Sequence, residues 1–251
     1  MDSSMTWMMR LIFAAVFLVP GLQAARALGG TSATDGSDIV GVSTVMVLGI
    51  PASSCTGTVI RQDVVITAAH CVRSQQLAVA FLEDGAPALR PVQSIILHPA
   101  SSDARRPVDI ALVLLQDALP GRFVPVLMDD ASTMRETGTA LTVAGFGLQA
   151  SAQPKTAGTL RQATVLAVRP STERVIRIAA PQNDGALLIC KGDSGGPVFA
   201  EAHSGRPVLA AILYGRDGKE SAVEPTQCSR TGQAIRVSQY REWIDTQLAR
   251  W

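Results

Sequence analysis

The chain has 251 residues, of which 22 are basic and 21 are acidic, so its formal net charge at pH 7 is +1. Such an even balance gives no reason to expect a nucleic acid or another polyanion as a partner. At this length the chain can form one or two domains with a substantial hydrophobic core, and it needs no metal to stabilise that core.

The first 26 residues have the layout of a secretory signal peptide. A weakly basic start at residues 1–10 precedes an apolar run at 11–19 and a stretch of small residues at 20–27. A transmembrane helix needs about 20 apolar residues, and this run has about half of that number. We therefore expect residues 1–26, or 1–27, to be removed. The product would be secreted or periplasmic and would have no stable membrane association.

Past residue 27 the sequence consists of short apolar runs rich in Val, Ile and Leu, separated by clusters of Gly, Pro, Asp and Ser. This pattern predicts an all-β protein. The expected strands include residues 45–50, 64–67, 77–82, 92–97, 110–115, 140–144, 164–168, 175–178 and 208–214. One helical period follows near the C-terminus, where steps of three and four separate Val237, Tyr240, Ile244, Leu248 and Trp251. We expect a helix within residues 237–251 that packs on the β structure.

Three segments that lie far apart in the chain indicate nucleophilic catalysis. Ser194 lies in Gly-Asp-Ser-Gly-Gly-Pro, His70 lies in Thr-Ala-Ala-His-Cys, and Asp109 opens Asp-Ile-Ala-Leu. A serine hydroxyl is a poor nucleophile at neutral pH, so an imidazole must take its proton. A carboxylate is then needed to fix the imidazole tautomer and to stabilise the imidazolium that forms. The backbone N–H groups of Gly192 and Ser194 are candidates to stabilise the developing oxyanion.

Each of these residues also has a simpler interpretation. A histidine beside a cysteine is often a packed core residue, and an aspartate at the start of a strand often caps a turn. Residues 192–196 also satisfy the G-x-S-x-G pattern of α/β-hydrolases. That fold places its acid and its histidine after the serine, and only His203 follows Ser194, nine residues later. The spacing leaves no room for the strand and helix between them.

The order His70, Asp109, Ser194, with the flanking residues quoted above, resembles the trypsin/chymotrypsin family of serine endopeptidases. The resemblance extends from about residue 29 to the C-terminus. Residues 55–60 are similar to the strand before the catalytic histidine, and residues 143–147 are similar to the Gly-aromatic-Gly turn of the family.

The resemblance implies a fold of two six-stranded antiparallel β-barrels with a C-terminal α-helix. The first barrel would occupy residues 27–130 and the second residues 131–236, with the helix in 237–251. His70 and Asp109 would then come from the first barrel and Ser194 from the second. The site would lie in the cleft between the barrels, which is a common place for a binding site.

The function that the resemblance implies is a secreted serine endopeptidase that hydrolyses peptide bonds through an acyl-enzyme. Ser194 would attack, His70 would act as base and then as acid, and Asp109 would orient it, while the Gly192 and Ser194 amides would form the oxyanion hole. We expect no cofactor and no metal, a protein or peptide as substrate, and a monomer. The alternative is a catalytically silent binding protein on the same scaffold.

Four cysteines in an exported chain imply two disulfides and allow three pairings. No two of them stand at the C-x-x-C spacing of a metal or redox site. The family resemblance selects Cys55 with Cys71, and Cys190 with Cys228.

Asp193 precedes the candidate nucleophile. By resemblance it forms a buried ion pair with a newly formed N-terminal ammonium, and this pair orders the oxyanion hole. Ile39 resembles the usual Ile-Val-Gly start of the family, but starting there would delete most of the first strand. We therefore expect the mature chain to start at Ala27 or Leu28. The sequence leaves open whether an inactive precursor exists.

The resemblance also outlines a specificity pocket. Leu188 falls at the position of the pocket base with Ile189 beside it, while Tyr214, Gly215 and Gly232 fall on the walls. An apolar floor cannot neutralise a lysine or arginine side chain, and burying an unpaired charge is costly. The sequence thus predicts cleavage after apolar residues of small to medium size.

Overall fold

The computed structural model describes residues 43–50, 53–73, 76–83, 85–102, 108–130, 136–148, 157–181, 189–202, 206–216 and 228–251. The predicted signal segment, both candidate N-termini and Leu188 lie outside these ranges. All structural statements below concern the described residues.

Six antiparallel strands close the first barrel in the order β1-β2-β3-β6-β5-β4. Their bounds are β1 (Thr44–Ile50), β2 (Ser53–Arg61), β3 (Val64–Thr67), β4 (Gln76–Glu83), β5 (Ala86–Leu97) and β6 (Ala111–Leu115). In β4 the buried side chains of Val79 and Phe81 alternate with the half-buried side chains of Ala78 and Ala80. In β3 and β6 every residue is buried, because these two strands are covered on both faces.

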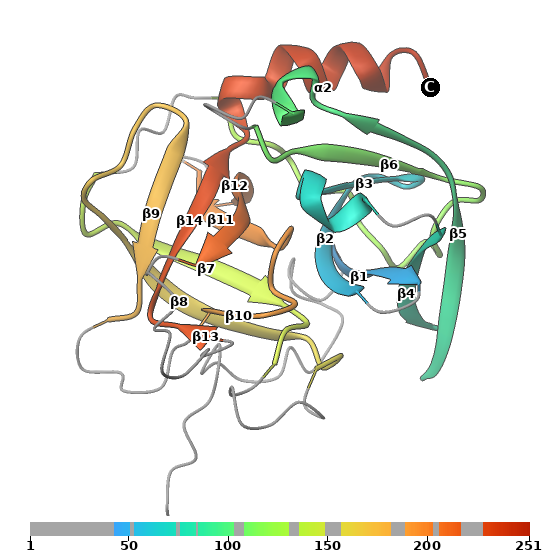
Figure 1. Ribbon diagram of the computed structural model, residues 1–251, viewed down its shortest axis with the longest axis horizontal. Helices are drawn as coiled ribbons and strands as arrows, with labels where there is room; N and C mark the ends of the chain where they lie inside the picture. Colours follow the sequence, from blue (N-terminus) through green and yellow to red (C-terminus); the bar gives the residue numbers. More distant parts are fainter. Residues whose placement is uncertain are drawn as a thin grey trace, which may run out of the picture.

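Six further strands close the second barrel in the order β11-β12-β14-β9-β8-β7. Their bounds are β7 (Ala140–Gly145), β8 (Arg161–Val168), β9 (Val175–Ala179), β11 (Pro197–Glu201), β12 (Pro207–Arg216) and β14 (Thr231–Arg236). Two short strands, β10 (Ile189–Cys190) and β13 (Cys228–Ser229), pair with each other beside this barrel. The prediction of two six-stranded antiparallel barrels with a C-terminal helix is confirmed (Figure 1).

A hydrophobic cluster joins the two barrels to the C-terminal helix. It combines buried side chains of the first barrel, such as Ile66 and Leu112, with buried side chains of the second, such as Ile212. The helix α2 (Arg241–Leu248), which follows the 3-10 turn η4 (Ser238–Tyr240), adds Ile244 to this cluster. Figure 1 shows α2 lying across both barrels. The helical period of the sequence thus marks the face that covers the junction of the barrels.

All four cysteines are in disulfides, with the pairing that the resemblance implied. Cys55–Cys71 joins β2 to the 3-10 turn η1 (Ala69–Val72), and Cys190–Cys228 joins β10 to β13. In the part of the chain that the structure covers, no helix combines the length and the apolar character required to cross a bilayer.

Candidate active site

His70 and Asp109 meet because the strands next to them are neighbours in the first barrel. His70 lies in η1, just after β3, and Asp109 lies just before β6, and β3 pairs with β6 from Val64 to Thr67. The Asp109 carboxylate accepts two hydrogen bonds from His70. Its Oδ2 is 2.5 Å from Nδ1 of the ring, and its Oδ1 is 2.8 Å from the backbone nitrogen. The two bonds fix both the position and the rotation of the imidazole.

This contact also sets the tautomer of His70. A carboxylate accepts hydrogen bonds and donates none, so Nδ1 carries the hydrogen and Nε2 of the neutral ring is left as a base. The His70 side chain is 40% exposed whereas that of Asp109 is 16% exposed. The pair therefore has its carboxylate on the protected side and its free ring nitrogen on the accessible side.

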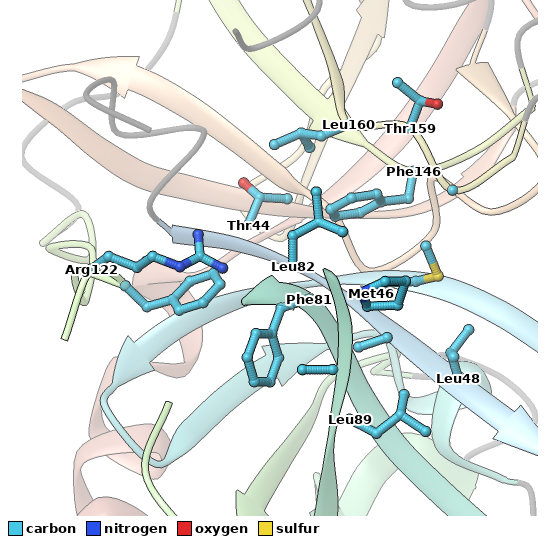
Figure 2. A pocket seen from close by; sticks show the side chains of 15 residues that line it. Thr44, Met46, Leu48, Phe81, Leu82, Leu89, Arg122, Phe146, Thr159 and Leu160 are labelled. Carbon is cyan, nitrogen blue, oxygen red and sulfur yellow. The ribbon is translucent and has the colours of Figure 1, made fainter. Parts of the chain in front are cut away.

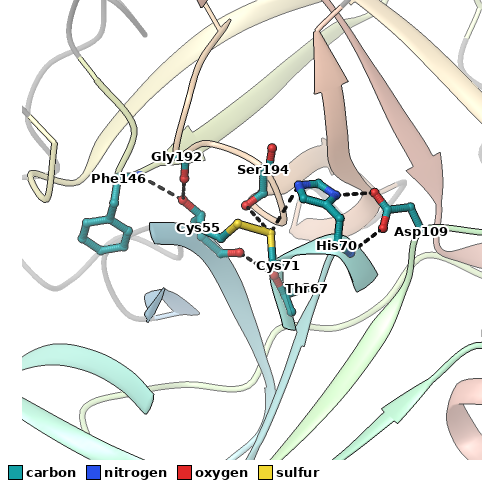
Figure 3. The surroundings of a disulfide bond; sticks show 9 residues. Cys55, Thr67, His70, Cys71, Asp109, Phe146, Gly192 and Ser194 are labelled. Carbon is teal, nitrogen blue, oxygen red and sulfur yellow. Dashed lines mark hydrogen bonds and ion pairs between the residues drawn. A yellow bond between two sulfur atoms is a disulfide. The ribbon is translucent and has the colours of Figure 1, made fainter. Parts of the chain in front are cut away.

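Ser194 reaches this pair from the second barrel, in the turn between β10 and β11. Its carbonyl oxygen lies 3.6 Å from Cys71 Sγ, and the same sulfur lies 3.6 Å from His70 Nε2. Figure 3 shows Ser194 next to the edge of the imidazole that carries Nε2. Among the described residues, no hydrogen bond joins the Ser194 hydroxyl to the His70 ring. The fold thus brings the three predicted side chains into one place, with the hydroxyl not yet engaged.

Close backbone packing holds the Ser194 turn against the first barrel. Gly195 has φ +82°, and a Cβ built on it would lie 2.0 Å from Thr67 Oγ1 and 2.2 Å from the Thr56 carbonyl oxygen. No side chain fits there, and the left-handed backbone itself favours glycine. The glycine after Ser194 therefore lets the two barrels approach each other at the site.

Thr56 is a residue whose role the sequence did not indicate. Its backbone N–H donates to the Ser194 carbonyl at 2.8 Å, and its hydroxyl donates to the Gly192 carbonyl at 2.8 Å. The same hydroxyl accepts the N–H of Phe146 at 3.0 Å. Thr56 is fully buried, so these bonds are not exposed to competition from water. A threonine in a strand is common, and only the contact with residues far along the chain reveals what it does.

Two backbone N–H groups of the turn around Ser194 have no acceptor in the part of the chain that the structure describes. The N–H groups of Asp193, Gly195 and Gly196 donate to carbonyl oxygens within this turn or in β12. Those of Gly192 and Ser194 have no hydrogen-bond acceptor among the described residues. Backbone N–H groups in a folded protein are nearly always paired, so two free donors here form a site that can receive an anion or a polarised carbonyl oxygen.

Asp193 is completely buried beneath this turn. Its Oδ1 accepts the N–H of Gly147 and its Oδ2 accepts the N–H of Cys190, both at 2.8 Å. Burial raises the pKa of Asp193 to about 7, while these two bonds and the charge of Arg161 lower it. The ammonium expected as its partner would come from an N-terminus outside the described residues.

The predicted walls of the specificity pocket lie together. A Cβ built on Gly232 would lie 2.5 Å from Ile189 Cδ1 and 3.3 Å from the Gly215 carbonyl oxygen, so the Ile189 side chain lies against Gly232. A Cβ built on Gly215 would meet nothing within 4 Å, which indicates open space on that side. The Tyr214 hydroxyl donates to Gln233 Oε1. Ile189 itself is buried and belongs to the hydrophobic core of the second barrel.

Burial is the main factor that raises the pKa of Tyr214, and the nearby charge of Asp109 adds to it, while Arg177 lowers it. The Tyr214 hydroxyl is therefore kept neutral and is held as a donor to Gln233. Tyr214 therefore carries no charge at neutral pH.

Two other features near Ser194 do not belong to the candidate active site. Cys55, His70 and Cys71 place possible metal-binding atoms within 4.8 Å of one another, but the two sulfurs are bonded to each other and offer no thiolate. A separate cavity of about 640 Å³ lies on the far side of Phe146, between that side chain and the first barrel (Figure 2). Its lining is mostly apolar, and neither Ser194 nor His70 contributes to it.

Comparison with known proteins decides the family. The Trypsin family model matches residues 27–244 of the chain. The chain belongs to the trypsin family. Among its relatives, chymotrypsin-like elastase family member 1 of Bos taurus is 29% identical over 253 residues, covering 90% of this chain and 90% of that protein. The protein of the same name from Felis catus is 30% identical over 223 residues, covering 78% and 79%.

The similarity of this trypsin-family chain is not confined to elastase-named proteins. Serine protease 56 of Homo sapiens is 27% identical over 218 residues, which is 78% of this chain and 34% of that longer protein. The shared region in each case includes most of the chain. The family resemblance read from its sequence motifs is therefore confirmed.

Proposed function

We propose that the protein is a serine endopeptidase in which Ser194 is the nucleophile, His70 the general base and acid, and Asp109 the group that orients His70. The pair of hydrogen bonds from His70 to Asp109 is the observation that carries this proposal. It leaves Nε2 as a base on the accessible side, next to Ser194. In the proposed mechanism the Ser194 side chain rotates about χ1 so that its hydroxyl can donate to Nε2.

The reaction follows from these positions. Ser194 Oγ attacks the substrate carbonyl carbon while Nε2 takes its proton, and the imidazolium is stabilised by Asp109. The carbonyl oxygen becomes an oxyanion, and the unpaired N–H groups of Gly192 and Ser194 stabilise it. His70 then returns the proton to the leaving amine, which leaves an acyl-enzyme on Ser194. Water attacks this ester while His70 takes its proton, and His70 passes the proton to Ser194 Oγ as the acid is released.

The substrate preference that we propose is cleavage after apolar residues of small to medium size. Two observations support this preference: the apolar Ile189 side chain lies against Gly232, and a Cβ built on Gly215 would meet nothing within 4 Å. A charged side chain would meet no partner on the apolar surface of Ile189. Profiling with a peptide library tests this, and preferential cleavage after arginine or lysine would overturn it.

We further propose export through residues 1–26 and a mature chain that starts at Ala27 or Leu28. The apolar run is too short to be an anchor, and the family match begins at residue 27. N-terminal sequencing of the exported protein tests this, and a start at Ile39 would contradict it.

Reaction of Ser194 with a fluorophosphonate probe tests the proposed activity directly. The wild type should be labelled at Ser194, and both Ser194→Ala and His70→Ala should abolish labelling. The lack of a hydrogen bond between the Ser194 hydroxyl and His70 favours a second candidate, a binding protein without catalysis. A correctly folded and processed wild type that is not labelled would favour that candidate.

A further inference from the structure

The cavity on the far side of Phe146 is lined by both barrels. Its volume of about 640 Å³ lies within the range of about 300–1,000 Å³ that is usual for small-molecule sites. Strands β1, β4 and β5 of the first barrel supply most of the lining, and Phe146 and residues 158–160, just before β8, supply the second-barrel side. Figure 2 shows these side chains around the cavity. Its shape therefore depends on how the two barrels pack.

The lining is mostly apolar, and part of it is in contact with water. Five large apolar side chains are exposed among the described residues, and two of them, Leu82 and Leu89, line this cavity. Each of the two is 57% exposed. Exposed apolar surface that gathers in one hollow is typical of a ligand-binding groove. Covering these side chains with an apolar group would remove them from water and would favour binding.

The hydroxyl of Thr44 is a buried polar group that faces the same cavity. Thr44 is the first residue of β1, it is only 2% exposed, and it belongs to the lining. In the described part of the chain its Oγ1 has no hydrogen-bond partner. Buried hydroxyl groups nearly always have one. A ligand in the cavity can supply the partner that the described residues do not.

Arg122 is the one charged residue among the described residues that line the cavity. Its guanidinium lies over the Phe123 ring, 4.2 Å from the centroid, so the contact leaves its N–H donors available. No carboxylate of the described ranges forms an ion pair with it. In Figure 2, Arg122 and Thr44 lie toward one end of the cavity, and Leu48 and Leu89 lie toward the other. One end is therefore polar and positively charged, and the rest is apolar.

We propose that this cavity binds the anion of an aliphatic carboxylic acid, that is, a fatty acid. The carboxylate accepts hydrogen bonds from the Arg122 guanidinium and the Thr44 hydroxyl, and the alkyl chain lies against the apolar side chains of both barrels. The planar guanidinium suits a carboxylate in both charge and geometry. A peptide fits this lining less well, because its backbone N–H and C=O groups would be buried against apolar side chains without partners. This binding site is separate from the proposed chemistry at Ser194.

Isothermal titration calorimetry with decanoate tests the proposal, at concentrations below those at which decanoate forms micelles. The protein is the whole chain with Ser194→Ala, so that self-digestion plays no part. Hexanoate and octanoate are the shorter probes. Decanol and decyltrimethylammonium carry the same alkyl chain with no charge and with a positive charge. Thermal unfolding shows whether each variant folds.

Three substitutions in the lining each have a matched control. Arg122→Met removes the charge, and Arg206→Met does the same at an exposed arginine outside the lining. Thr44→Val removes the hydroxyl and keeps the shape. Its control is Thr58→Val, because Thr58 pairs with Thr44 across the strands and its hydroxyl is also buried without a partner, but it does not line the cavity. Leu82→Ser makes the wall polar, and Leu127→Ser does so at a leucine that is 59% exposed elsewhere.

Decanoate should bind once per chain, and its affinity should exceed that of the shorter acids by about threefold for each added CH₂ group. Arg122→Met should weaken decanoate about tenfold, leave decanol unchanged and strengthen decyltrimethylammonium. Thr44→Val should weaken decanoate about fivefold. Leu82→Ser should weaken decanoate and decanol alike. The three control variants should bind every probe as the parent protein does.

The inference is wrong if decanoate does not bind, if its affinity does not depend on chain length, or if Arg122→Met leaves it unchanged. Equal losses in the lining variants and their controls would show non-specific adsorption to exposed apolar surface. If a capped peptide of leucine and glutamate binds while decanoate does not, and Arg122→Met weakens the peptide, the cavity is a peptide site instead. None of these results depends on labelling of Ser194, so a failure of this inference leaves the proposed function untouched, and the reverse also holds.

Discussion

Replacing the buried Gly195 with alanine should destabilise the protein more than alanine at the exposed glycines Gly85 and Gly121. The new Cβ would lie 2.0 Å from Thr67 Oγ1 and 2.2 Å from the Thr56 carbonyl oxygen, and Thr67 Oγ1 is already bonded to that carbonyl at 2.7 Å. Neither atom can move without breaking this bond. The left-handed backbone, with φ +82°, adds its own cost for any residue with a Cβ.

The cost of the steric clash and the cost of the left-handed backbone can be measured separately with two other glycines. Gly85 has φ +80° but open space around its Cβ, so Gly85→Ala should cost only the backbone term, about 1–2 kcal/mol. Gly121 has open space and no left-handed φ, so Gly121→Ala should be neutral or slightly stabilising. Gly195→Ala adds the cost of overpacking, about 1–3 kcal/mol, for a total of about 2–5 kcal/mol.

Urea and thermal unfolding measure these differences, in a Ser194→Ala background so that self-digestion cannot interfere. For a domain of this size Gly195→Ala should lower Tm by about 5–15 °C. In the active background the same substitution should also lower the rate of fluorophosphonate labelling, because it moves Ser194 away from His70. A loss within about 0.5 kcal/mol of that of Gly85→Ala would refute the close contact between the barrels.

Four further predictions concern the surroundings of the turn. Thr56→Val should cost about 2–4 kcal/mol, because it leaves a buried carbonyl and a partly buried N–H without their partner, and it should lower kcat/KM, whereas Thr56→Ser should retain most of the stability and the activity. Loss of the disulfide in Cys190→Ala/Cys228→Ala should cost about 4 kcal/mol in the chain-entropy model, measured by urea unfolding against the oxidised wild type. Gly232→Val should lower kcat/KM for medium apolar residues at the cleavage site about tenfold more than for alanine, measured with matched peptides. With a blocked N-terminus, Asp193 should make the free energy of unfolding fall as pH rises from 4 to 8, by about 4 kcal/mol, and Asp193→Asn should remove this part of the slope.

The sign of the Asp193 effect follows from its pKa. The carboxyl pKa is about 7 in the folded chain and 3.8 as its ordinary value, so the folded state binds the proton more tightly. The stabilisation is complete below the unfolded pKa and is lost as pH rises through the folded pKa. A slope of the opposite sign would show that a cation neutralises Asp193 more strongly than Arg161 does here.

Much of the architecture was predictable from the sequence. The β pattern arises from alternating and continuous apolar runs, and the strands found at 64–67 and 175–179 differ little from those expected. The strands β11 and β14 were not among the ranges predicted from apolar runs. β14 is Thr-Gly-Gln-Ala-Ile-Arg, which has little β propensity of its own, and it is a strand because β12 and β9 pair with it on both sides.

The candidate site likewise combines residues that the sequence predicts with residues whose role only the tertiary structure shows. The residue types and chain order of His70, Asp109 and Ser194 identify the chemistry, because general-base catalysis on a serine needs those three groups. Thr56 gave no such signal. It bonds a residue 136 positions away. Such contacts depend on how the two barrels pack against each other. Local sequence patterns do not show which residues that lie far apart in the chain meet in the folded protein. The sequence thus determined which groups react, while the packing of the barrels decided which residues hold those groups in place.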